Sequence, residues 1–313
     1  MSTQLVIIWF HRQTSFTGPF PHNIPHGAAA NPFFNDQEVR GTGQGLNFDA
    51  VMQYATSEGK HKMTDTDKEG LERVDAIKSV LDSYRPFSEH VVQQLRDYYR
   101  IGLTYTSNAI EGNTLTESET KVVIEEGLTI GGKSLREHSE ATGHARAYDH
   151  IYSLLNRALS EEDVLYLHRL FFQQIEPENA GKYRQKNVII TGTDFLPPDY
   201  REVSNLMKRH VENLNRVLID QHPLEWASDL HAEFESIHPF IDGNGRVGRL
   251  LLSILTMKNG YCPVMIPPIR RAEYIAALQK ANKGDLYKLR SFILSVVHEE
   301  MKSLKRLVEG LVK

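Results

Sequence analysis

The sequence is poor in cysteine, and this scarcity excludes two classes of site. Cys262 is the single cysteine among 313 residues. The chain can therefore form no internal disulfide and no zinc site built from several thiolates. We expect Cys262, next to Pro263, to be a small buried side chain.

Long apolar runs are also missing. No stretch approaches the roughly 18 apolar residues that a membrane-spanning helix needs. A short apolar run, Leu5 to Phe10, lies near the start. It has no cationic segment before it and no small-residue cleavage site after it, so it does not resemble a signal peptide. These features predict a cytoplasmic protein with no membrane partner.

The charge is nearly balanced, with 36 Lys and Arg against 40 Asp and Glu, a formal net charge of −4. This balance excludes a strongly basic surface over the whole chain, although not a local patch, so no nucleic-acid partner is expected. The apolar fraction of 40% and the charged fraction of 24% are typical of a folded globular protein.

The chain divides into two parts of different composition. Residues 1–62 are rich in glycine and proline and show little helical periodicity, which predicts a poorly ordered N-terminal arm with at most a short strand near Leu5–Trp9. A small partner-binding module is the alternative for this part. Residues 63–313 show helical patterning throughout, with a core expected at about 135–309.

Helix caps and apolar spacing predict most of the helices in this second part. Ser88 can cap a helix over about 88–111, and Thr116 with Glu119 forms a capping box for a helix that ends at Gly127. Ser160 opens another. Further helices are expected over about 201–218, 224–237, 245–259, 271–282 and 285–309.

One segment breaks the helical pattern. Val188 to Thr191 is β-branched, and Gly192 and the pair Pro197-Pro198 follow it, which predicts a short β-hairpin. Strands do not alternate with helices, so a parallel α/β sheet is not expected. The predicted fold class is all-α, with one inserted hairpin.

Gly127 to Ser134 matches the phosphate-binding pattern G-x-x-x-x-G-K-[ST] literally. A P-loop needs a buried strand directly before it, whereas Glu119 to Glu126 is charged and amphipathic. We therefore interpret this segment as a glycine-rich connection between two helices, and expect Lys133 to play no part in binding ATP.

A stronger candidate site is the loop from His238 to Arg249, HPFIDGNGRVGR. Apolar helices precede and follow it. Gly243 and Gly245 can leave backbone N–H groups uncovered at the start of the second helix, where the helix dipole favours an anion.

The charged residues of this loop suit phosphate chemistry. Arg246 and Arg249 are three residues apart, so both guanidinium groups can reach one side of a helix. Asp242 is a hard oxygen ligand for Mg²⁺ beside a phosphate. His238 is the nearby group that titrates near neutral pH, and therefore the candidate general base.

The loop matches every fixed position of H-x-F-x-[DE]-G-N-G-R-x-x-R, and in this the chain resembles the Fic family. Eight fixed residues recur by chance about once in 10¹⁰ starting points. The resemblance extends from about residue 65 to the C-terminus. It implies an all-α Fic-type bundle with a β-hairpin flap, and an enzyme that transfers AMP from ATP to a hydroxyl side chain of a target protein.

The resemblance also implies roles for single residues. His238 would deprotonate the incoming hydroxyl, Asp242 would hold Mg²⁺, and Phe240 would anchor the loop. The ATP-binding residues that it implies are Asp242, Gly243, Asn244, Gly245, Arg246, Val247, Gly248 and Arg249 in the loop, Ile190, Thr191, Gly192 and Thr193 in the flap, and Tyr274 and Asn282 around adenosine.

Ser107 to Gly112 matches the family's inhibitory pattern [ST]-x-x-x-E-[GN]. The match implies an autoinhibited class, in which Glu111, on the same helix as Ser107, pairs with Arg249 and blocks the γ-phosphate contact. Relatives are often dimers, so a homodimer is a further expectation.

Three alternatives remain open at this stage. The same site can remove AMP, with Glu111 aligning a water molecule. It can transfer a phosphoryl group or another nucleotide. The fold can also serve as a non-enzymatic regulatory module, such as a toxin–antitoxin partner or a transcription regulator.

Overall fold

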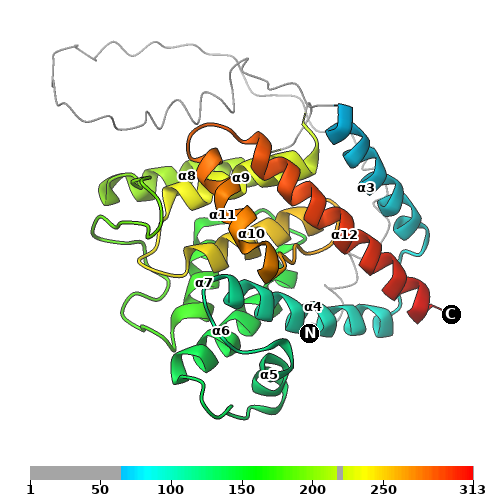
Figure 1. The fold of residues 1–313 in the computed structure, drawn as a ribbon, viewed down its shortest axis with the longest axis horizontal. Helices are drawn as coiled ribbons and strands as arrows, with labels where there is room; N and C mark the ends of the chain where they lie inside the picture. The colour runs from blue at the N-terminus through cyan, green and yellow to red at the C-terminus, as the bar shows by residue number, and fades with distance from the viewer. Residues whose placement is uncertain (1–64, 217–220, 313) are drawn as a thin grey trace.

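A computed structural model describes residues 65–216 and 221–312, and all regular structure in these residues is helical (Figure 1). The predicted N-terminal arm and the short strand expected near Leu5–Trp9 lie outside the described residues. The α-helices are α3 (Asp65–Ser83), α4 (Glu89–Ile110), α5 (Glu117–Lys121), α6 (Leu135–Ile151), α7 (Glu161–Phe172), α8 (Val203–Leu214), α9 (Pro223–Ile237), α10 (Asn244–Lys258), α11 (Arg271–Ala281) and α12 (Tyr287–Leu311).

The caps that the sequence predicted are formed. The Ser88 hydroxyl accepts from the Val91 amide at the start of α4, and Thr116 and Ser160 each form a capping box. Ser134 forms a further capping box, at the start of α6, that was not predicted. The predicted helix over 201–218 is shorter, because α8 ends at Leu214 and a 3₁₀ turn occupies Tyr200–Glu202.

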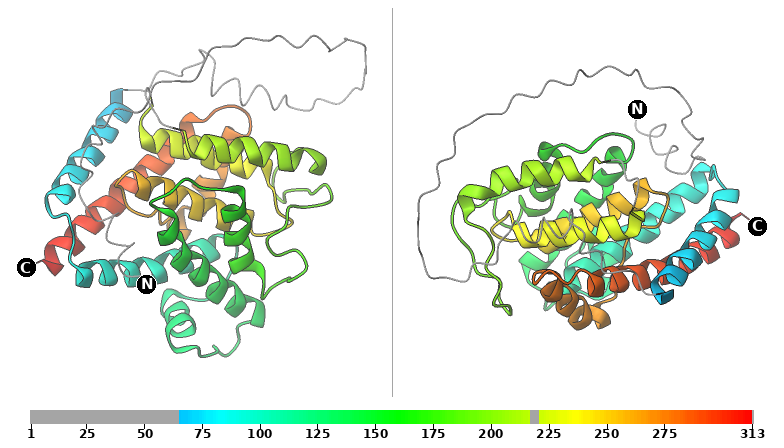
Figure 2. Two further views of the ribbon diagram at one scale, coloured as in Figure 1. Left: turned by 180° about the vertical axis from the view of Figure 1, so that it is seen from behind. Right: turned by 90° about the horizontal axis from the view of Figure 1, so that it is seen from above.

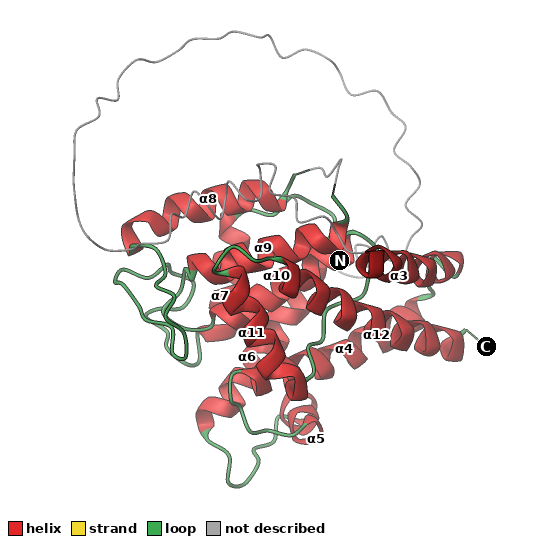
Figure 3. Cartoon of the chain, turned by 45° about the horizontal axis from the view of Figure 1, so that its top comes forward, coloured by secondary structure: helices red, strands yellow, loops and turns green. Residues whose placement is uncertain are grey.

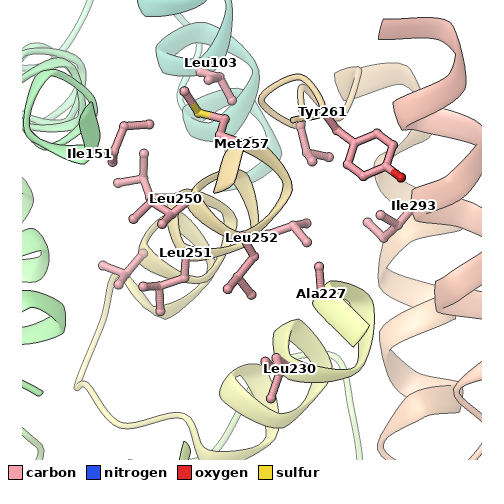
Figure 4. Close-up of a cluster of buried hydrophobic side chains, with 14 of the residues drawn as sticks. Leu103, Ile151, Ala227, Leu230, Leu250, Leu251, Leu252, Met257, Tyr261 and Ile293 are labelled. Atoms are coloured by element: carbon pink, nitrogen blue, oxygen red, sulfur yellow. The ribbon is translucent and has the colours of Figure 1, made fainter. Parts of the chain in front are cut away.

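Helix α10 lies at the centre of the fold. It packs against α9, α6, α4 and α7, and all of its residues from Arg246 to Met257 are buried. Figure 4 shows Leu250, Leu251 and Leu252 pointing toward side chains of the surrounding helices, among them Ile151 and Leu230. The residues just before Asn244 are therefore attached to the best-packed element of the described chain.

The remaining helices enclose this centre. Helix α12 packs along α3 and also contacts α9 and α11, and α8 lies beside α9 (Figure 2). Cys262, in the segment after α10, is completely buried, as predicted. None of the helices in residues 65–216 and 221–312 is both long enough and apolar enough to cross a membrane.

The β-hairpin predicted around Val188–Pro198 is not formed. Figure 3 shows this part of the chain as loop, with a turn at Thr191–Gly192. Pro197 and Pro198 supply no N–H donors to a returning strand, and Ile189 is 80% exposed, so no apolar face is buried. The loop is closed at its base instead, where the Tyr200 amide donates to the Asn187 side chain.

The P-loop-like segment is a connection between helices, as predicted. A π-helical turn, Val122–Glu126, precedes it and ends at Gly127 in the left-handed region. Ser134 caps α6. Lys133 donates through Nζ to the Thr114 carbonyl at 2.6 Å and lies 3.7 Å from Glu119.

We expect Lys133→Ala to lower the free energy of unfolding by about 1 kcal/mol, because the Thr114 carbonyl loses its donor, and to leave ATP affinity unchanged. The matched control is Lys121→Ala, whose exposed ion pair with Glu125 spans 3.9 Å and whose loss should cost less than about 0.5 kcal/mol. Urea unfolding and calorimetric titration with ATP measure both quantities. A large loss of ATP affinity in Lys133→Ala would restore the P-loop interpretation.

Candidate active site

The loop between α9 and α10 begins and ends with residues in the left-handed region. His238 ends α9 with φ 50°, a conformation that few residues other than glycine adopt. Gly243 precedes α10 with φ 82°. These two positions turn the chain between α9 and α10, so that His238 precedes the N-terminus of α10 by a short loop.

Asn244 fixes the shape of the loop from inside. Its side-chain amide donates to the Phe240 carbonyl at 2.9 Å, and its side-chain oxygen accepts from the Phe240 amide at 2.8 Å. Phe240 is fully buried and stacks on His168 with ring centroids 3.8 Å apart. The expectation that Phe240 anchors the loop in the core is therefore met by its packing.

His168 fastens the loop to α7. Its Nδ1 accepts from the Gly181 amide at 2.9 Å, and its Nε2 lies 3.1 Å from the Asp242 carbonyl. Since Nδ1 is the acceptor, Nε2 carries the proton and donates to Asp242. Burial lowers the pKa of His168 to about 4, so this histidine is neutral at physiological pH and serves as a structural bridge.

His238 is held by its backbone and left free at one ring nitrogen. Arg184 donates through Nε to the His238 carbonyl at 2.9 Å. The ring Nδ1 lies 3.4 Å from the Glu235 carbonyl, which can only accept, so Nδ1 carries the proton and Nε2 keeps its lone pair. Burial lowers the pKa of His238 to about 4. The sequence suggested a base titrating near neutrality, whereas this imidazole stays neutral well below pH 6.

The guanidinium of Arg249 is buried against the last turn of α4. It donates to the Ser107 hydroxyl at 3.0 Å, to the Ser107 carbonyl at 2.9 Å and to the Glu111 carboxylate at 2.8 Å. A β-carbon at position 245 would lie 2.3 Å from Glu111 Oε1, so Gly245 provides the space for this carboxylate. Burial opposes ionisation of Glu111, but Arg249 and Arg246 outweigh it and hold the pKa of Glu111 below its usual value.

A second carboxyl group faces Arg249 from the end of α9. Glu235 Oε1 is buried, has no hydrogen-bond partner in the described structure, and would lie 2.3 Å from a β-carbon at Gly248. Burial raises the pKa of Glu235 to about 8, although Arg249 acts against this. Glu235 is therefore mostly protonated at pH 7, and Glu111 supplies the negative charge that Arg249 needs.

Four charged side chains form a ring of ion pairs beside the loop, here called the salt-bridge ring. Arg246 lies 3.0 Å from Glu140 and 3.3 Å from Asp242, and Arg136 lies 3.2 Å from Glu140 and 2.5 Å from Asp242. Arg246 is almost fully buried over the ring of Phe171. Arg136 is 55% exposed.

The residues expected around adenosine are buried and already have protein partners. Tyr274 donates its hydroxyl to His231 Nε2 at 2.7 Å, and its ring lies 6.0 Å from the Arg249 guanidinium carbon. Asn282 accepts from the Ser236 hydroxyl at 2.8 Å. The loop residues Ile190–Thr193 reach α11, where Gln279 donates to the Gly192 carbonyl at 2.9 Å.

Sequence reasoning missed several residues that hold the site together. Each of them contacts the loop from far away in the sequence. Arg184 contacts His238 across a separation of 54 residues. The separation between His168 and Asp242 is 74 residues, and that between Arg136 and Asp242 is 106 residues. Arg136 and Glu140 are four residues apart on a helix, a spacing that usually indicates a solvated surface pair. Nothing in the spacing of these residues could therefore have assigned them to the site.

We expect Asn244→Ala to lower the free energy of unfolding by about 2–4 kcal/mol, because it leaves the buried Phe240 amide and carbonyl without partners. Asn259→Ala is the matched control. Asn259 makes one hydrogen bond to a backbone carbonyl, that of Leu255, so its loss should cost about 1 kcal/mol. Equal losses for the two variants in urea unfolding would contradict the role given to Asn244.

Comparison with known proteins identifies relatives of this chain. The sequence model of the Fic/DOC family matches residues 158–256. Protein adenylyltransferase Fic of Drosophila erecta is 34% identical over 230 residues, which cover 72% of this chain and 46% of the relative. Protein adenylyltransferase fic-1 of Caenorhabditis elegans is 37% identical over 223 residues, 69% of this chain and 42% of the relative. The chain thus spans less than half the length of these curated relatives.

This chain matches a larger share of a solved relative. A variant fragment of Fic-1 from C. elegans superposes with a TM-score of 0.68 and 32% identity, over 77% of this chain and 72% of that fragment. The arrangement of helices is thus shared over most of both chains. This chain belongs to the Fic/DOC family.

Proposed function

We propose that this chain is a protein adenylyltransferase, which transfers AMP from ATP to a Ser, Thr or Tyr hydroxyl of a target protein, and that Glu111 inhibits it. The observation that carries the proposal is a neutral His238 imidazole on the loop that leads into the N-terminus of α10, with Arg249 buried on the same helix. The relatives are named protein adenylyltransferases.

The residues of the loop suit each part of this reaction. The target hydroxyl oxygen attacks the α-phosphorus of ATP, and its proton passes to His238 Nε2. The bond from the α-phosphorus to the bridging oxygen breaks, and pyrophosphate leaves. The amides at the start of α10 stabilise the added charge on the α-phosphate oxygens, and Arg249 binds the γ-phosphate when Glu111 is absent.

Asp242 fits a magnesium ion by its chemistry. Its carboxylate is 40% exposed at the loop surface, and Mg²⁺ is usually bound by one or two carboxylates together with phosphate oxygens and water. Within residues 65–216 and 221–312 no group of three or more His, Cys, Asp or Glu could hold a metal. Asp242 would therefore hold the ion together with ATP, and the ion would offset the charge of the phosphates.

The loop Ile190–Thr193 suits the docking of a target segment. It forms no strand and turns at Thr191–Gly192, so the backbone groups beside this turn have no strand partner, and an extended target segment could pair with them. Tyr274 and Asn282 then line the adenosine side of the site. A homodimer remains a prediction.

Glu111 explains how such an enzyme would be kept inactive. Its carboxylate occupies Arg249 at 2.8 Å, and a γ-phosphate would need the same guanidinium. ATP bound without that contact would hold its α-phosphate out of line with the incoming hydroxyl. A misplacement of about 1 Å can lower the rate on the order of a hundredfold.

We expect His238→Asn and His238→Ala to lower AMP transfer by about 10²–10⁴-fold while ATP affinity changes little, because a general base is lost. Asparagine tolerates the left-handed backbone at this position, so His238→Asn separates loss of the base from strain in the loop. Transfer of labelled AMP and calorimetric ATP binding are the measurements. Full activity in both variants would exclude His238 as the base.

We expect the acid limb of the pH–rate profile of the activated Glu111→Gly enzyme to lie at or below about pH 4, since this variant lacks the Glu111 carboxylate that raises the pKa of His238. The base works in its neutral form, and burial lowers the pKa of His238 to about 4. Protonation, and with it loss of activity, therefore begins well below the ordinary histidine value of about 6.5. An acid limb at pH 6.5 would show that the ring is not buried in the active enzyme.

We expect Glu111→Gly to raise self-modification with labelled AMP by about a hundredfold, because Arg249 is released while its bonds to Ser107 remain. Arg249→Ala in the same background should cancel the gain. Glu137→Gln is a control, because Glu137 is a half-buried carboxylate in the capping box of α6, away from Arg249. If Glu111→Gly is no more active than wild type, the autoinhibition proposal fails.

A further inference from the structure

Both oxygens of the Asp242 carboxylate are engaged by other groups of the protein. Oδ1 accepts from the Gly243 amide at 2.6 Å and from Arg246 at 3.3 Å. Oδ2 accepts from Arg136 Nη2 at 2.5 Å. A cation bound at this carboxylate must therefore share or take over an oxygen that a guanidinium already holds.

The two arginines of the salt-bridge ring are not equivalent. Arg246 lies on α10, is almost fully buried and is held by Glu140 and by the Phe171 ring. Arg136 lies in the first turn of α6 and is 55% exposed, and its other partner, Glu140 at 3.2 Å, is on the same helix. Its guanidinium can therefore leave Asp242 for solvent without moving the core. Arg136 is thus the partner of Asp242 that can leave.

We propose that Arg136 occupies the metal-binding oxygen of Asp242 when no metal is bound, and that Mg²⁺ accompanying ATP must displace it. This inference rests on the proposed function, since it assumes a nucleotide whose phosphates complete the metal site. The guanidinium and the ion compete for the same negative charge. Arg136 therefore sets the Mg²⁺ concentration at which the site fills, independently of the contact between Glu111 and Arg249.

The exposure of the ion pair between Arg136 and Asp242 limits how much Arg136 can change the Mg²⁺ requirement. Exposed ion pairs in solution contribute little, since water and salt screen them. Replacing Arg136 by glutamine removes the competing charge and keeps a polar side chain on α6. The Mg²⁺ concentration for half-maximal nucleotide binding should then fall by about two- to fivefold.

The test uses the full chain and an ATP analogue with a methylene bridge between the α- and β-phosphorus atoms. Calorimetry measures the analogue's dissociation constant in EDTA and over a series of Mg²⁺ concentrations. Arg136→Gln should lower the required Mg²⁺ by two- to fivefold and change the affinity in EDTA by less than about twofold. Arg136→Lys keeps the positive charge but loses the planar, forked guanidinium. Its Mg²⁺ requirement should lie between those of Arg136→Gln and wild type.

Two controls define the comparison. Arg73→Gln removes the same charge from an exposed ion pair with Glu69 on α3, and should leave the Mg²⁺ dependence unchanged. Asp242→Asn should remove the Mg²⁺ dependence of analogue binding, and Arg136→Gln should then have no further effect on it.

The outcomes separate the possible failures. If Arg136→Gln weakens analogue binding equally in EDTA and in Mg²⁺, Arg136 contacts the phosphates directly, and the proposal is overturned. An unchanged Mg²⁺ dependence would overturn it as well. Failure of both wild type and Glu111→Gly to bind the analogue under any condition would instead refute the proposed function.

Discussion

The structure of the site depends on one buried cation, the guanidinium of Arg249. An ion inside a protein costs several kcal/mol unless it is paired and hydrogen-bonded. Here the pairing comes from a single turn of α4, which supplies the Ser107 hydroxyl, the Ser107 carbonyl and the Glu111 carboxylate. The contact between Glu111 and Arg249, which we propose to be inhibitory, is therefore also a stabilising contact between α4 and α10. A phosphate that replaces Glu111 must satisfy the same guanidinium.

The charges around the loop are balanced in the resting state. Arg249 is paired with Glu111, and the salt-bridge ring pairs its two arginines with two carboxylates. Glu235 adds no full negative charge at pH 7, because burial raises its pKa to about 8. A nucleotide with its metal would therefore exchange partners within an existing set of charges and would not enter an empty basic pocket.

Much of the fold and the centre of the site could be predicted from the sequence, because the information is local. The predicted caps at Ser88 and Ser160 lie directly before the first residues of α4 and α7, and the segment 238–249 carries the candidate site residues within twelve positions. The supporting residues could not be predicted, because Arg136 and Arg184 contact the loop through tertiary packing. The β-hairpin was wrong for a related reason: β-branched residues favour strands, but strands also need a partner, and Pro197-Pro198 provides none.

The attachment of the active loop to α10 has a consequence for how this molecule can be controlled. The helix is buried along most of its length, and the loop before it is fixed by Asn244, His168 and Arg184. Segments with such contacts open only when the surrounding core opens, so their amides should exchange hydrogen as slowly as those of the core. Local unfolding of the loop alone therefore cannot inactivate the protein. Under the proposed function, control would therefore come from a side chain that can be withdrawn from the site, as we propose for Glu111, while the loop itself stays folded.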